Sequence, residues 1–143
     1  SWKRIKTITG QTLSYIDRSC RNGSCYQYRI LAFTGNHTSP VSALQTACRL
    51  SPVQIKYARN KTSRTLQLKF SKNKKATGYR VEYSRSKTFK RRQSITLTNS
   101  GSSRCTLKKL TRNKTWYIRI AAYKKYAGKT WYSSSVTLSR KIR

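Results

Sequence analysis

Acid–base groups are scarce in this chain of 143 residues, which contains two carboxylates, Asp17 and Glu82, and one histidine, His37. Two carboxyl groups roughly 5–9 Å apart perform glycoside hydrolysis, and a nucleophile beside a base performs acyl transfer. Asp17 lies in one predicted module, residues 1–50, and Glu82 lies in another, residues 51–143. No such set of groups can therefore be assembled, and we predict no catalytic residues. We expect Glu82 to meet an Arg or Lys across a sheet, Asp17 to cap a turn and His37 to be exposed.

The cysteines are the other candidates for chemistry: Cys20, Cys25, Cys48 and Cys105. No CxxC motif is present and the one histidine is far from metal-ligand spacing, so we predict no metal site and no cofactor. An even number of cysteines in a short chain favours disulfides formed in an oxidising compartment, although free buried thiols also fit the sequence. Four cysteines allow three pairings, and their spacing alone does not choose among them.

The chain is strongly basic, because 33 Lys and Arg against 2 Asp and Glu give a formal net charge of +31. Residues 1–50 carry a net charge of +6 and residues 51–143 carry +25. Such a surface attracts polyanions, and it also keeps a protein soluble. No stretch approaches the ~18 apolar residues of a membrane helix, so we expect no membrane insertion. No nucleic-acid reader motif is present, so nucleic acid would bind only non-specifically.

One group of basic residues lies before, within and after the segment 79–83. We predict that it forms a track for polyanions, made of Lys74, Lys75, Arg80, Arg85, Lys87, Lys90, Arg91 and Arg92. The alternative is that these side chains cover a solvated strand face and bind nothing.

Aromatic and basic residues alternate in a second candidate site near the C-terminus. Its members are Tyr126, Trp131, Tyr132, Lys124, Lys125 and Lys129. Aromatic rings stack on sugars or bases while neighbouring cations hold anionic groups, so this segment predicts a binding hairpin. The alternative is that the rings only cover cross-strand neighbours.

Alternating apolar residues indicate the elements that must position these groups. Residues 65–70 place Leu66, Leu68 and Phe70 on one face, and the segments 79–83 and 116–122 alternate in the same way. Such strands bury one face and expose the other, and turn signals separate them. The pattern predicts an all-β fold, an antiparallel β-sandwich of short strands.

The sequence also repeats with a period of about 90 residues, which is typical of tandem sandwich modules. Residues 26–33 align with 116–123, and residues 2–7 align with 90–95. We therefore divide the chain into a partial module at 1–50, and a complete module at 51–143.

The second unit resembles a fibronectin type III domain, in the form found in secreted wall proteins of Gram-positive anaerobic bacteria. The resemblance is carried by the segment 76–84 and by Leu110, Trp116, Ile118, Ile120, Ala122 and Tyr123. It implies a tyrosine corner at the start of strand F, a position that Tyr26 fills in the first unit. The second unit has Trp116 there, and it has Phe70 where the family often has Trp on strand B.

Under this resemblance, residues 1–50 supply only strands C′, E, F and G of a module, so strands A, B and C are missing. Half a sandwich cannot bury its inner face, and it leaves open strand edges. We expect either that the sequence is a fragment with a missing upstream segment, or that another chain supplies the missing strands.

The resemblance also suggests how the cysteines pair. It places all four near the joint between the units, and it implies Cys20–Cys25 closing a short loop with Cys48–Cys105 crossing the joint. The alternative is Cys25–Cys48 as a cross-strand pair, because the hairpin centred near His37 sets those two positions almost opposite.

The function that the resemblance implies is a non-catalytic extracellular module, secreted or on the cell surface, that binds or acts as a spacer. We expect its partner to be an anionic cell-wall polymer or polysaccharide. The alternative is a bacterial surface domain that binds a host protein through its loops. The sequons at Asn22, Asn36, Asn60 and Asn113 fall in predicted turns, and we attribute them to turn chemistry.

Overall fold

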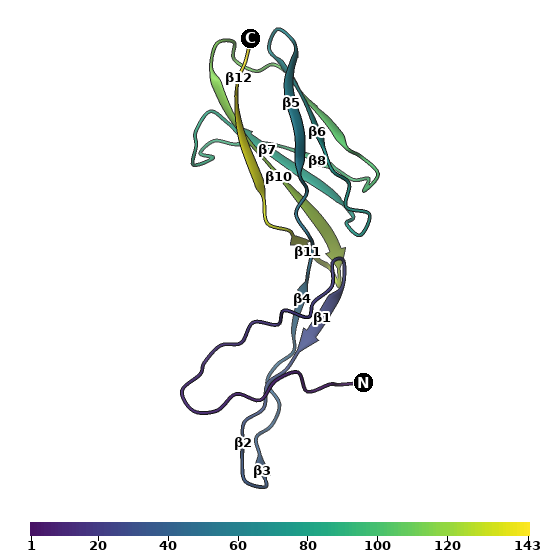
Figure 1. The fold of residues 1–143 in the computed structure, drawn as a ribbon, viewed down its shortest axis with the longest axis vertical. Coiled ribbons are helices and arrows are strands. Elements are labelled where there is room, and N and C mark those ends of the chain that lie inside the picture. Colours follow the sequence, from purple (N-terminus) through teal and green to yellow (C-terminus); the bar gives the residue numbers. More distant parts are fainter.

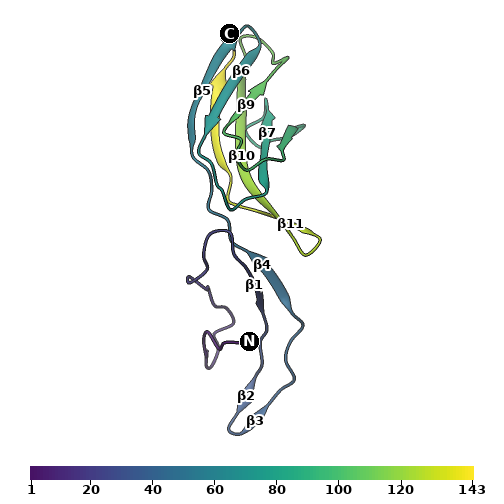
Figure 2. The same cartoon turned by 90° about the vertical axis from the view of Figure 1, so that its right-hand side faces the viewer.

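In this computed structural model, which describes residues 1–143, the chain forms twelve β-strands and no helix (Figure 1). A two-layered sandwich occupies one end of the elongated molecule and a thin N-terminal part extends from it (Figures 1 and 2). The strands are β1 (Cys25–Tyr28), β2 (Phe33–Thr34), β3 (His37–Thr38), β4 (Gln45–Cys48), β5 (Ile55–Thr62), β6 (Thr65–Phe70), β7 (Gly78–Ser84), β8 (Gln93–Leu97), β9 (Arg104–Leu107), β10 (Thr115–Tyr126), β11 (Lys129–Tyr132) and β12 (Val136–Lys141).

The sandwich packs a sheet of β5, β6 and β9 against a sheet with the order β11-β10-β7-β8. Strand β12 pairs with the first half of β10 and β11 pairs with its last four residues, so both strands lie along the same edge of β10. All pairings are antiparallel. The predicted antiparallel β-sandwich is confirmed, and each of the three predicted strands lies within β6, β7 or β10.

The core forms because alternate residues of each strand point between the two sheets. Leu66, Leu68 and Phe70 are at most 1% exposed, and Ile118 and Ile120 of β10 are fully buried opposite them. Burying each such side chain contributes roughly 1.5–3 kcal/mol. Because this apolar core fixes β7 and β10 in the sandwich, it also fixes the relative positions of the polar side chains on their outer face.

The predicted tyrosine corner is present in the N-terminal part and absent from the sandwich. The hydroxyl of Tyr26 accepts a hydrogen bond from the backbone N–H of Arg21 at 2.9 Å. At the equivalent position of the second unit, Trp116 is buried and its Nε1 has no hydrogen-bond partner. Its ring instead lies 5.8 Å from that of Tyr83, so packing replaces the corner hydrogen bond.

The N-terminal part has a single layer. Strand β1 pairs with β4, and β2 pairs with β3. The strands expected in residues 1–24 as C′ and E do not form, because no neighbouring strand supplies partners for their backbone groups. Apolar side chains remain exposed here, and Leu13 at 96% is the most exposed of them.

The disulfide joins Cys25 to Cys48, which lie directly opposite each other in the β1–β4 ladder. The expected pairs Cys20–Cys25 and Cys48–Cys105 are therefore wrong, and the cross-strand alternative is confirmed. Cys20 and Cys105 are free thiols. Cys105 belongs to β9 and faces the core opposite Leu68, and burial raises the pKa of its thiol to about 11.

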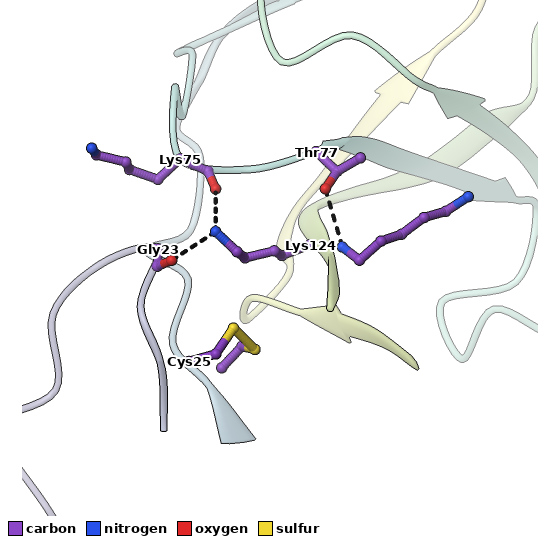
Figure 3. The surroundings of a disulfide bond; sticks show 7 residues. Gly23, Cys25, Lys75, Thr77 and Lys124 are labelled. Carbon is purple, nitrogen blue, oxygen red and sulfur yellow. Dashed lines mark hydrogen bonds between the residues drawn. A yellow bond between two sulfur atoms is a disulfide. The ribbon is translucent and has the colours of Figure 1, made fainter. Parts of the chain in front are cut away.

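The side chain of Lys124, in the sandwich, contacts the N-terminal part near this disulfide. The Nζ of Lys124 donates to the carbonyl of Gly23 at 2.7 Å and to that of Lys75 at 3.4 Å (Figure 3). Gly23 has a φ of +82°, and a Cβ there would lie 2.3 Å from the Cβ of Lys75. The close approach at the joint therefore requires glycine at this position.

Candidate functional site

Three arginines converge on one carboxylate on the outer face of the sheet that contains β7, β8 and β10. Oε1 of Glu82 accepts from Nε of Arg92 at 2.8 Å and lies 3.2 Å from Nη2 of Arg80. Oε2 accepts from Nε of Arg119. We call these four residues, Arg80, Glu82, Arg92 and Arg119, the arginine cluster.

Strand register brings the arginine cluster together. Arg119 of β10 lies directly opposite Glu82 of β7, and Arg80 shares their face because side chains two residues apart point the same way. Arg92 precedes β8 and reaches Glu82 from the other side. The expectation that Glu82 meets a basic residue across the sheet is confirmed.

The carboxylate of Glu82 is held in its ionised form. Its side chain is 10% exposed, and this burial by itself opposes ionisation. The hydrogen bonds from Arg119 and Arg92 outweigh the burial and lower the pKa of Glu82 below its usual value. One negative charge is thus surrounded by three positive ones, and the cluster keeps a net charge of about +2.

Aromatic rings fix two of the arginines. The guanidinium of Arg119 lies over the ring of Phe89, 4.4 Å from its centroid. Nη1 of Arg80 is 3.4 Å from the hydroxyl of Tyr132 on β11, which pairs with the far edge of β10. An open hollow of about 310 Å³ lies among these groups, lined by Arg80, Glu82, Arg92, Arg119, Ala121, Tyr132 and Ser135.

The predicted polyanion track is divided between the two ends of β7. Lys74 and Lys75 precede the strand, at the joint, whereas Arg85, Lys87, Lys90 and Arg91 follow it. Seven residues of strand separate these groups by about 20 Å. Arg80 and Arg92 belong to the arginine cluster between them.

The predicted aromatic hairpin is formed by β10 and β11, but its rings do not share one surface. Trp131 and Tyr132 are consecutive in β11 and point to opposite faces. Tyr126 is 44% and Tyr132 is 47% exposed. Lys124 turns to the joint, where its hydrogen bonds to backbone carbonyls make it a structural residue. Lys125 and Lys129 lie opposite Thr130 and Tyr126 in the hairpin ladder.

Two residues were not predicted from the sequence: Arg119, which belongs to the arginine cluster, and Phe89, which contacts Arg119. The alternation that buries Ile118 and Ile120 already places Arg119 on the outer face of its strand. What the sequence lacked was the register that sets it opposite Glu82.

A second polar cluster lies in the N-terminal part. Oδ1 of Asp17 accepts from the backbone N–H of Ser19 at 2.9 Å, which confirms that this carboxylate caps a turn. The hydrogen bonds from Ser19 lower the pKa of Asp17 to about 2. The other carboxylate oxygen lies 3.1 Å from the hydroxyl of Tyr28, which donates to it. Both acidic residues of the chain are thus engaged with neighbouring side chains or backbone.

His37 is exposed in the β2–β3 hairpin, as expected. The structure contains no group of three or more His, Cys, Asp or Glu side chains that could hold a metal ion. It also contains no helix that is long and apolar enough to cross a membrane.

Comparison with known proteins gives the following matches. The family model of the fibronectin type III domain matches residues 51–138. No curated protein matches the sequence. Among solved structures, the FN1–FN3 domains of chicken CNTN1 align with 90% of this chain and 46% of their own, at 17% identity and a TM-score of 0.56.

A two-domain fibronectin type III segment of chicken tenascin aligns with 82% of this chain and 65% of its own, at 19% identity and a TM-score of 0.57. A computationally redesigned β-sandwich protein aligns with 66% of this chain and 91% of its own, at 26% identity and a TM-score of 0.53. The chain therefore spans less than half of the CNTN1 structure and about two thirds of the tenascin segment.

Proposed function

The chain belongs to the fibronectin type III domain family, and from this premise we propose that it is a non-catalytic extracellular module that binds an anionic polymer through its charge. The polymer class that we favour is a cell-wall polymer or polysaccharide at the cell surface. Domains of this family serve as binding or spacer modules, so what distinguishes this chain has to come from its own surface.

The observation that carries the proposal is that almost all the positive charge is free of acidic partners. Both carboxylates are already engaged, and all three ion pairs in the structure share Glu82. Of 33 Lys and Arg, thirty therefore have no carboxylate within ion-pair distance. Exposed cations of this kind gather a polyanion by releasing its counterions.

The test is retention of the chain on beads that carry dextran sulfate, polyphosphate or neutral dextran, at 50 mM and 500 mM NaCl. We expect retention on both anionic polymers at low salt, loss of most of it at high salt, and none on neutral dextran. Equal retention on the neutral polymer, or retention that ignores salt, would contradict a charge-driven mechanism.

The stiff joint supports an accompanying role as a spacer. Asn73 donates to Oδ1 of Asn22 at 3.3 Å, and the N–H of Ser51 donates to the same oxygen at 2.9 Å, so the side chain of Asn22 connects the N-terminal part to the sandwich. Together with the Lys124 contacts, these bonds hold one orientation between the two parts. We propose that residues 1–50 are part of one module and residues 51–143 are a complete second one.

A second candidate function is recognition of a host protein by the β10–β11 hairpin. It is favoured by the exposed rings of Tyr126 and Tyr132, because exposed tyrosines are common in protein interfaces. A protein captured at 500 mM NaCl and lost when both tyrosines are changed to Ala would support this function over polymer binding.

A further inference from the structure

We propose that the hollow over Glu82 is a specific site for one tetrahedral oxyanion, the sulfate or phosphate group of an anionic polymer. This inference rests on the proposed function and locates a discrete site within it. General attraction needs only a high density of charge, whereas this site depends on the orientation of particular guanidinium groups.

Glu82 leaves several hydrogen-bond donors of the arginines free. Arg92 and Arg119 each bind Glu82 through Nε, and their Nη groups have no protein acceptor. The two Nη groups of each guanidinium can therefore donate a pair of hydrogen bonds to two oxygens of one anion. Two such edges suit a group with three or four oxygens better than a carboxylate, which has two.

The arginine side chains are held in place before an anion binds. Three arginines within ion-pair distance of the same carboxylate would repel one another without it, so Glu82 acts as a positioning residue. Phe89 holds the plane of Arg119, and the hydroxyl of Tyr132 holds Arg80. Groups fixed before binding lose little side-chain freedom when an anion arrives.

The three arginines are partly removed from water. The side chains of Arg119, Arg80 and Arg92 are 34%, 36% and 48% exposed, which strengthens their attraction for an anion relative to fully exposed lysines. The hollow of about 310 Å³ corresponds to roughly ten water molecules, enough for one oxyanion and part of its hydration shell.

The most informative variants keep the positive charge of the side chain and remove its planar guanidinium group. Arg92→Lys and Arg119→Lys preserve net charge but replace the planar edge with a single ammonium group. We expect each to weaken binding to dextran sulfate or polyphosphate about tenfold in 150 mM NaCl, the effect of losing one charge-assisted hydrogen bond. The matched control is Arg140→Lys, at an exposed position of β12, which should bind as the wild type does.

Glu82→Gln separates the two mechanisms by the sign of its effect. The change raises the net charge by one, so attraction by charge density alone predicts tighter binding. If Glu82 positions the arginines, binding becomes weaker. Thermal unfolding of each variant establishes that it is folded, and the two Arg→Lys variants decide the question if Glu82→Gln does not fold.

The side-chain NMR signals of the arginines provide a readout without a polymer. With inorganic sulfate and inorganic phosphate as probes, we expect saturable shifts of the Nε–Hε signals of Arg92 and Arg119, and only weak linear shifts for Arg140. The ion that saturates at the lower concentration shows whether sulfate or phosphate fits the site better.

Each remaining outcome has a defined meaning. Variants that bind like the wild type, with steep salt dependence, would overturn the oxyanion site and leave the proposed function intact. A wild-type chain that no anionic polymer retains at 50 mM NaCl would overturn both.

Discussion

Reducing the disulfide between Cys25 and Cys48 should unfold the β1–β4 ladder and leave the sandwich intact. The ladder has four residue pairs and no second layer, and an isolated two-stranded hairpin is at best marginally stable in water. The two cysteines are 23 residues apart, and closing a loop of that length stabilises the folded state by about 3.4 kcal/mol. The sandwich core is built from residues 50–142 and contains neither of these cysteines.

Hydrogen exchange measured by NMR on the oxidised and reduced chains tests this prediction. A loss of about 3.4 kcal/mol corresponds to roughly 300-fold faster exchange of the hydrogen-bonded amides of β1 and β4. The amides of β6 and β10 should exchange at unchanged rates, because their stability comes from the core. The double variant Cys25→Ser/Cys48→Ser should behave like the reduced chain, and Cys20→Ser serves as the control that keeps the disulfide.

Two results would refute this reasoning. Amides of β1 and β4 that keep their protection after reduction would show that contacts other than the disulfide stabilise the ladder. Equal loss of protection in β6 and β10 would show that the two parts unfold as one cooperative unit.

Three further predictions concern stability and reactivity. At pH 8, iodoacetamide should modify the half-buried Cys20 long before Cys105, whose thiol pKa of about 11 keeps it protonated, and equal rates by mass spectrometry would contradict this. Because the pKa of Glu82 is lowered in the folded state, its ionised form stabilises the fold above about pH 4.5, and this stabilisation is lost as the pH falls through the lowered pKa. The variant Glu82→Gln should therefore flatten that part of a curve of Tm against pH. Leu66→Ala should cost about 2–5 kcal/mol in urea denaturation and Leu13→Ala, at an exposed position, less than about 0.5, so similar costs would disprove the assignment of the core.

The strands of the sandwich could be predicted because the alternation of apolar residues is visible within each short segment of the sequence. Alternation in residues 65–70 identifies both the strand and its buried face, since every second side chain must point the same way. Tyr26 was likewise recognisable from a motif, and its hydroxyl makes the expected corner bond.

The features that the sequence left open or did not predict depend on register between strands. The sequence offered Cys25–Cys48 only as an alternative pairing, and the structure assigns it because the two cysteines lie opposite each other in the β1–β4 ladder. The position of Arg119 beside Glu82 has the same origin. The strands expected before residue 25 do not form for a related reason. A segment with alternating apolar residues becomes a strand only where a neighbouring strand offers partners for its backbone hydrogen bonds.

Salt dependence of polymer affinity tests the central claim most directly. Dissociation constants for dextran sulfate and for polyphosphate would be measured from 50 to 500 mM NaCl, for the wild type and for a variant with Tyr126 and Trp131 changed to Ala. The account predicts a steep linear fall of log affinity with log salt, and the same slope for both proteins. Affinity that resists salt and disappears with these two aromatic residues would contradict it and assign binding to the hairpin instead.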